Sequence, residues 1–343
     1  MEDYALAMVE YQKGNFGKAI KGWKKVASNN ALEEKIRGKA YLGMGFAYTK
    51  SENLKEAINS LRFALGLFQK VNDKKSQAET LGVLGGIYFR NNLIREALAT
   101  FQTALVLAQQ IKNKEMEADL LDEIGSILDF VDKYDEAIDF FSRSIKIYRK
   151  LAKNQESRGE ARALYDLGLT FFHAKKLEEA RSILEKASRI MKKNNDRKGE
   201  ANLHSVLGDI YLENGQTEIA EKNYKRAQDY YQTNKVMAGI INTELGFGKI
   251  LIIKENWVQA KGKFETALDL ATKNSYLKLS ASALLYLSKI AEKLGDSKEG
   301  ETYKKKANKI LKELGIKTED VEVKTENPVN KTEDFVNRPE ENK

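Results

Sequence analysis

The chain has 343 residues, 42% of them hydrophobic, and a formal net charge of +8. It contains no cysteine, which excludes a disulfide framework and a cysteine-based metal site. No apolar run approaches the roughly 18 residues of a membrane-spanning helix, and no basic stretch precedes an apolar one near Met1. We therefore expect a cytoplasmic protein with no membrane span and no signal peptide.

One local pattern, centred on an alanine, recurs along the chain with gaps of 38, 40, 40, 43, 40 and 40 residues. An eighth copy has Gly300 in place of the alanine, and the longest gap includes the region around Lys153 to Gly159. The alanines are Ala19, Ala57, Ala97, Ala137, Ala180, Ala220 and Ala260. Self-similarity at such a period predicts stacked repeats, here over residues 1–315.

Each repeat reads as two helices. In one copy, Leu81, Leu84 and Tyr88 have helical spacing, the polar segment 90–92 interrupts the pattern, and Ala97 and Phe101 resume it. A glycine lies twelve residues before the alanine in six copies. Two small residues at that spacing predict a close crossing of the two helices, which a larger side chain would push apart. Glu244 is an exception to the pattern, because it takes a usually apolar position.

These residues resemble the tetratricopeptide repeat pattern. Leu81, Leu84-Gly85, Tyr88, Ala97, Phe101 and Ala104 fit it in order, and the match extends from about residue 2 to about residue 314. The period of about 40 residues exceeds the usual 34, which is similar to the arrays of kinesin light chains and bacterial peptide-pheromone receptors. The resemblance implies an all-α, right-handed superhelical solenoid of about eight antiparallel helix pairs.

The last segment, residues 316–343, differs from the repeats. It holds both prolines of the chain, and its 8 acidic residues outnumber its 5 basic ones. Its few large apolar residues predict a disordered polar tail rather than another repeat.

Enzyme chemistry has little support in the sequence. The two histidines, His173 and His204, fall in different repeats, and His204 takes a core-facing position. The glycine pairs that imitate nucleotide-binding motifs, such as those at 43–45 and 246–248, fall on repeat positions and follow no strand. We expect no catalytic residues, no metal site and no cofactor.

The resemblance instead implies a non-enzymatic scaffold or adaptor that binds a protein or peptide in the concave groove lined by the first helices. The exposed positions of three successive first helices are acidic and aromatic, although the chain as a whole is basic. A solvated helix face is the alternative explanation of this cluster. We expect the bound segment to carry basic residues next to apolar ones. The predicted groove residues are Asp119, Asp122, Glu123, Asp129, Tyr165, Asp166, Phe172, Asp209 and Glu213.

Two other functions stay open. A peptide-sensing regulator would resemble the bacterial pheromone receptors, but those often have an additional N-terminal effector domain, and this chain begins directly in a repeat. Basic clusters on the second helices, which could attract nucleic acid or another acidic partner, form the third possibility. We rank nucleic acid below protein, because lysine is the ordinary solubilising residue of an exposed helix. The clearest such clusters are Lys146, Arg149, Lys150 and Lys153, and Arg189, Lys192, Lys193, Arg197 and Lys198.

Overall fold

The computed structural model describes residues 2–153 and 157–316, and within them the regular structure is entirely helical. The predicted tail lies outside the described residues, apart from Ile316. The helices are α1 (Glu2–Gln12), α2 (Phe16–Ser28), α3 (Glu34–Lys50), α4 (Leu54–Lys70), α5 (Lys74–Arg90), α6 (Ile94–Gln110), α7 (Lys114–Phe130), α8 (Tyr134–Leu151), α9 (Arg158–His173), α10 (Leu177–Lys193), α11 (Arg197–Glu213), α12 (Thr217–Thr233), α13 (Met237–Ile253), α14 (Trp257–Lys273), α15 (Leu277–Lys293) and α16 (Ser297–Leu314).

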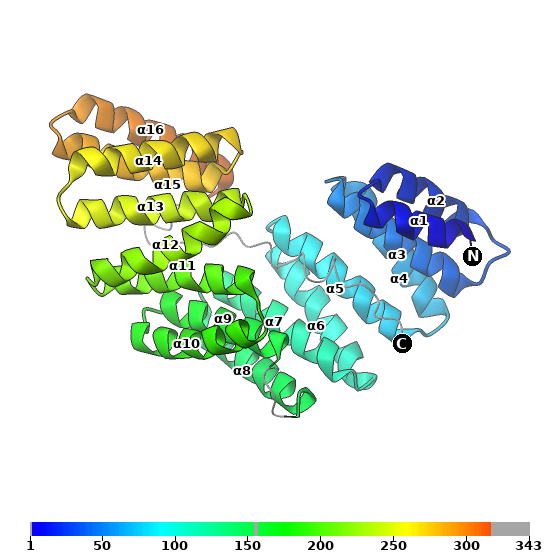
Figure 1. Cartoon of the computed structure of the whole chain (residues 1–343). Coiled ribbons are helices and arrows are strands. Elements are labelled where there is room, and N and C mark those ends of the chain that lie inside the picture. The colour runs from blue at the N-terminus through cyan, green and yellow to red at the C-terminus, as the bar shows by residue number, and fades with distance from the viewer. Residues whose placement is uncertain (1, 154–156, 317–343) are drawn as a thin grey trace. The chain divides into compact units, whose positions relative to one another are not determined.

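The chain divides at residue 155 into two compact units. Unit 1 contains α1–α8 and unit 2 contains α9–α16. Each unit is a stack of antiparallel helix pairs, as Figure 1 shows. The predicted all-α solenoid of eight helix pairs is confirmed. The division falls within the longest step between repeats, so the additional residues mark a boundary in the array.

Most successive first helices contact each other within their unit. In unit 1, α3 contacts both α1 and α5, and in unit 2 a row of contacts joins α9, α11, α13 and α15. Among the described residues, no comparable contacts join successive second helices. The first helices are therefore closer together than the second helices, which places them on the inner side of the curve of each unit.

The small residues of the repeat explain how each helix pair packs. Ala97 is fully buried, and a Cβ atom added to Gly85 would lie 3.0 Å from ring atoms of Phe101. In the next repeat, Phe141 has the same relation to Gly125. The predicted tight crossing is confirmed, and the space at each glycine is filled by the large side chain four residues after the repeated alanine.

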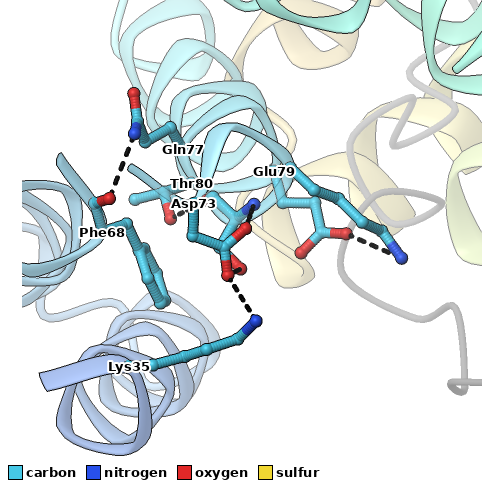
Figure 2. A network of polar contacts seen from close by, with 8 residues as sticks. Lys35, Phe68, Asp73, Gln77, Glu79 and Thr80 are labelled. Carbon is cyan, nitrogen blue, oxygen red and sulfur yellow. Dashed lines mark hydrogen bonds and ion pairs between the residues drawn. The ribbon is translucent and has the colours of Figure 1, made fainter. Parts of the chain in front are cut away.

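Side chains fix the start of several first helices. Asp73 caps α5 by accepting a hydrogen bond from the backbone N–H of Ser76, and its carboxylate is 2.9 Å from the Lys35 ammonium of α3. Gln77 donates to the carbonyl oxygen of Phe68 in α4 at 3.1 Å (Figure 2). This network ties α3, α4 and α5 together, because each helix contributes a partner.

Candidate functional site

The predicted groove residues are on three first helices. Asp119, Asp122, Glu123 and Asp129 lie on α7 in unit 1. The other five lie in unit 2: Tyr165, Asp166 and Phe172 on α9, and Asp209 and Glu213 on α11. The fold thus brings them together as two sets, one in each unit, on helices of the inner layer.

Most of these side chains are more buried than the sequence pattern predicts. On α7, the exposed fractions of Asp119, Asp122 and Glu123 are 4%, 3% and 8%. On α9, Tyr165, Asp166 and Phe172 are buried as well. Asp129 and Asp209 are half-buried, and only Glu213 is exposed. The expectation that these positions are exposed was therefore wrong for most of them, and the buried carboxylates need partners inside the protein.

Tyrosines of the second helices supply some of those partners. The Tyr148 hydroxyl on α8 donates a hydrogen bond to Asp119 of the same repeat. In unit 2, the Tyr231 hydroxyl on α12 donates to Asn202 of α11 at 2.9 Å. Each tyrosine follows its partner by 29 residues. A hydrogen bond from a second-helix tyrosine therefore orients a polar side chain of a first helix in both units.

Asp209 belongs to a longer row of contacts across three first helices. Its carboxylate accepts a 2.8 Å hydrogen bond from the Tyr224 hydroxyl and is 3.8 Å from the Lys249 ammonium of α13. Lys249 in turn lies 5.8 Å from the ring centroid of Tyr286 on α15. Burial lowers the pKa of Lys249, but Tyr286 and Asp209 outweigh it and raise this pKa above its usual value. Lys249 therefore stays charged.

Glu213 also has a lysine partner. Both of its carboxylate oxygens are 2.9 Å from the ammonium of Lys175, which lies 5.5 Å from the ring centroid of Phe172. In unit 2, two of the predicted acidic residues are thus matched by lysines of neighbouring repeats. In unit 1, the Tyr148 hydroxyl fixes the position of the Asp119 carboxylate.

Sequence reasoning missed Tyr148, Tyr231 and Lys249. The tyrosines could have been found, because a spacing of 29 residues between a polar first-helix position and a second-helix tyrosine occurs twice. Lys249 could not have been found in this way, because its contacts join helices of different repeats.

His204 is confirmed as a packed histidine: its Nδ1 is 2.8 Å from the Asn223 side-chain oxygen, and burial lowers its pKa.

The described residues contain no group of three or more histidine, cysteine or carboxylate side chains able to hold a metal ion. None of the described helices combines the length and apolarity needed to cross a lipid bilayer.

A tetratricopeptide repeat family model matches residues 37–110, 78–150 and 159–233, which together make up more than half of the chain. No curated protein matches the sequence.

Several solved structures share the fold. The apo form of RapI is 15% identical, with a TM-score of 0.65 over 80% of this chain and 98% of that chain. A Rap protein complexed with Competence and Sporulation Factor is 18% identical, with a TM-score of 0.61 over 86% and 80%. Aspartyl phosphate phosphatase F from Bacillus subtilis is 14% identical, with a TM-score of 0.66 over 86% and 74%. At these identities the similarity concerns the fold alone.

Proposed function

We propose that this chain, which belongs to the tetratricopeptide repeat family, is a non-enzymatic scaffold or adaptor that binds protein or peptide segments on its first helices. The fold is typically a binding scaffold, because a stack of helix pairs presents a long, preformed inner surface. The observation that carries the proposal is the tyrosine-held carboxylate of Asp119 on α7.

A held carboxylate favours binding for an energetic reason. An exposed aspartate loses rotamer freedom when it pairs with a ligand, whereas the Tyr148 hydroxyl has already restricted Asp119. Asp119 and Tyr148 are 4% and 5% exposed, so their hydrogen bond is protected from competition with water. Within unit 1, the acidic side chains of α7 support a segment that presents lysine or arginine. Within unit 2, Tyr165 and Phe172 separately support contact with apolar side chains.

The test is capture of immobilised peptides that vary in charge and apolar content, with the full chain as probe. We expect basic peptides with adjacent apolar residues to retain the protein, and retention to fall as salt rises. Asp119→Asn keeps a hydrogen-bond acceptor for Tyr148 but removes the charge, so it should weaken capture about tenfold. Asp139→Asn is the matched control, because Asp139 is 66% exposed on the second helix α8.

A second variant separates positioning from charge. Tyr148→Phe keeps the ring and removes only the hydroxyl that holds Asp119, so peptide capture should weaken about threefold to tenfold while the helical spectrum is unchanged. Tyr303→Phe is its control, since that hydroxyl bonds Glu299 at 3.1 Å on the last helix. Equal capture by Asp119→Asn, Tyr148→Phe and the unmodified chain would contradict the proposal.

Two alternatives remain distinguishable. If capture survives these changes but fails when Arg189, Lys192 and Lys193 are neutralised, the basic second helices form the site and an acidic partner or nucleic acid replaces the peptide.

A peptide-sensing regulator is favoured by the shared fold with the Rap protein whose structure contains Competence and Sporulation Factor. In that case, peptide should change hydrogen-exchange protection in helices far from the contact, whereas a passive scaffold shows local protection only.

A further inference from the structure

The N-terminal end of unit 1 exposes apolar side chains on α1. Leu6 is 57% exposed and Val9 is 43% exposed, and the two side chains lie three residues apart on the same face of the helix. A scattered exposed leucine is ordinary on a protein surface. Leu6 and Val9 differ from such scattered residues because the equivalent positions of the other repeats have a role in packing.

Leu6 and Val9 precede Ala19 by 13 and 10 residues. The residues at the same distances before Ala97 are Leu84 and Ile87, which are 5% and 0% exposed. These pack in one cluster with Ala57 and Leu61 of α4, the second helix of the preceding repeat. The two positions therefore form the surface that receives a preceding second helix.

The same burial recurs in the other repeats. Ile124 and Ile127 of α7 are both fully buried, and Leu287 and Ile290 of α15 pack in one cluster with Phe264 of α14. Only in α1, among the described first helices, are both positions apolar and both exposed. The N-terminal end of unit 1 thus presents a repeat interface that no described helix covers.

The last helix of unit 2 is built differently. Four residues after the repeated alanine, the internal second helices carry a large buried side chain such as Phe101, Phe141 or Phe264. The residue four positions after Gly300 is Lys304, which is exposed. A second copy stacked with its α1 on this helix would bury Lys304 against Leu6, at the cost of desolvating a charge. Head-to-tail stacking is therefore disfavoured.

We propose that two copies of this chain pair through α1, antiparallel and related by a two-fold axis. Glu2, Leu6, Val9 and Lys13 follow one another at intervals of four, three and four residues, which places them in one row along the helix. The backbone N–H of Lys13 still bonds the Val9 carbonyl at 3.1 Å, so the row continues helically past Gln12.

Antiparallel pairing makes this row complementary to itself. It opposes Glu2 to Lys13 of the partner subunit and Leu6 to Val9 of the partner subunit, and the two-fold axis repeats both contacts. Glu2 and Lys13 are exposed, so both are available for pairing. A parallel arrangement would oppose like charges at both ends of the row.

The contact is small, since it joins one helix of each copy, so the dimer is expected to dissociate on dilution. The test is sedimentation equilibrium on the full chain over a dilution series, with any affinity tag at the C-terminus. We expect the apparent mass to rise from 38.9 kDa towards twice that value with concentration. A constant mass of one chain up to the highest soluble concentration would overturn the proposal.

Two substitutions locate the interface. Leu6→Lys should keep the chain monomeric over the same range with an unchanged melting temperature, because Leu6 is mostly exposed. Val258→Lys is the matched control: Val258 is 74% exposed on α14, and its variant should dimerise normally. Dimerisation of the Leu6→Lys variant as strong as that of the unmodified chain would place the contact elsewhere and overturn the proposal.

Charge exchange tests the antiparallel order. Glu2→Lys alone and Lys13→Glu alone each oppose like charges at both ends of a homodimer, so each should weaken association about tenfold. Mixing the two variants restores opposite charges in the heterodimer and should restore association, as should both changes in one chain. Lys13 is also 3.8 Å from Glu10, so melting curves check that each variant folds. Failure of the mixture to associate more strongly than either variant alone would refute the antiparallel pairing.

Discussion

Substituting Gly208 with alanine tests the packing of a repeat most directly. Gly208 lies in the middle of α11, where alanine is favoured over glycine by about 1 kcal/mol in a helix. A Cβ atom at this position, however, would lie 2.5 Å from Cε1 and 2.6 Å from Cδ1 of Tyr224. Real Cβ atoms do not approach that closely, so the ring must move.

The surroundings of Tyr224 make that movement costly. Its side chain is 1% exposed, and its hydroxyl donates a 2.8 Å hydrogen bond to Asp209. Overpacking of a buried site costs about 1–3 kcal/mol, and a disturbed hydrogen bond adds about 1 kcal/mol. After subtraction of the helix-propensity gain, Gly208→Ala should lower the free energy of unfolding by about 1–3 kcal/mol.

The matched control is Gly262→Ala. Gly262 lies within α14, and a Cβ atom there would meet nothing within 4 Å, so the substitution should raise the free energy of unfolding by about 1 kcal/mol. Urea denaturation followed by far-ultraviolet circular dichroism compares the two variants under one condition. The reasoning is refuted if Gly208→Ala is as stable as Gly262→Ala, because the contact with Tyr224 would then impose no constraint.

Two further predictions concern unit 1. Ala137→Leu should lower the free energy of unfolding by about 1–3 kcal/mol in urea denaturation, because Ala137 is fully buried, whereas Ala99→Leu on an exposed surface should change it by less than about 0.5 kcal/mol. Burial raises the pKa of Asp73, but hydrogen bonds from Lys35 and Ser76 outweigh it, so the folded-state pKa is lowered. The stabilisation from Asp73 should be fully present above its unfolded pKa of about 3.9 and be lost as pH falls through the lower folded value, so the stability difference between the unmodified chain and Asp73→Asn should shrink there. A difference that stays constant down to acid denaturation would contradict this linkage.

The sequence predicts the helix pairs well because their packing depends on residue size. A glycine twelve residues before an alanine can be read directly from the sequence. In the structure, Ala57, Ala97 and Ala137 are completely buried. The turns between the helices are harder to predict from the sequence. Two residues after the end of most helices lies a residue with positive φ that is not glycine, such as Glu52 or Lys112. Since no glycine or proline marks these turns, they must be located from the repeat period and from polar segments such as 90–92 that interrupt the helical pattern.

The sequence predicted which helices carry the candidate site residues, but it did not predict which side chains contact them. Helical spacing placed Asp119 and Asp209 on first helices, which the structure confirms. The partners of these residues come from other helices, and which of them meet depends on the stacking angle between repeats. A local pattern therefore could not reveal that Asp209 meets Lys249, or that the acidic residues are mostly buried.

Glu244 shows how a departure from the repeat pattern is accommodated. It takes an apolar position on α13, is 7% exposed, accepts a 2.7 Å hydrogen bond from Gln228 of α12, and lies 2.9 Å from the Lys263 ammonium of α14. A buried ion pair stabilises little relative to apolar packing, whereas removal of one partner leaves an uncompensated charge.

This asymmetry gives opposite expectations for the two partners. Glu244→Leu restores the apolar pattern of the repeat and should leave the free energy of unfolding unchanged or higher, because the freed Lys263 side chain is 41% exposed and reaches water. Lys263→Met removes the cation and should lower the free energy of unfolding by about 1–3 kcal/mol, since Glu244 stays buried with Gln228 as its remaining partner in unit 2. Urea denaturation of both variants decides the point. If Glu244→Leu is instead the more damaging change, the ion pair is a net source of stability, and the family's apolar residue does not suit this position.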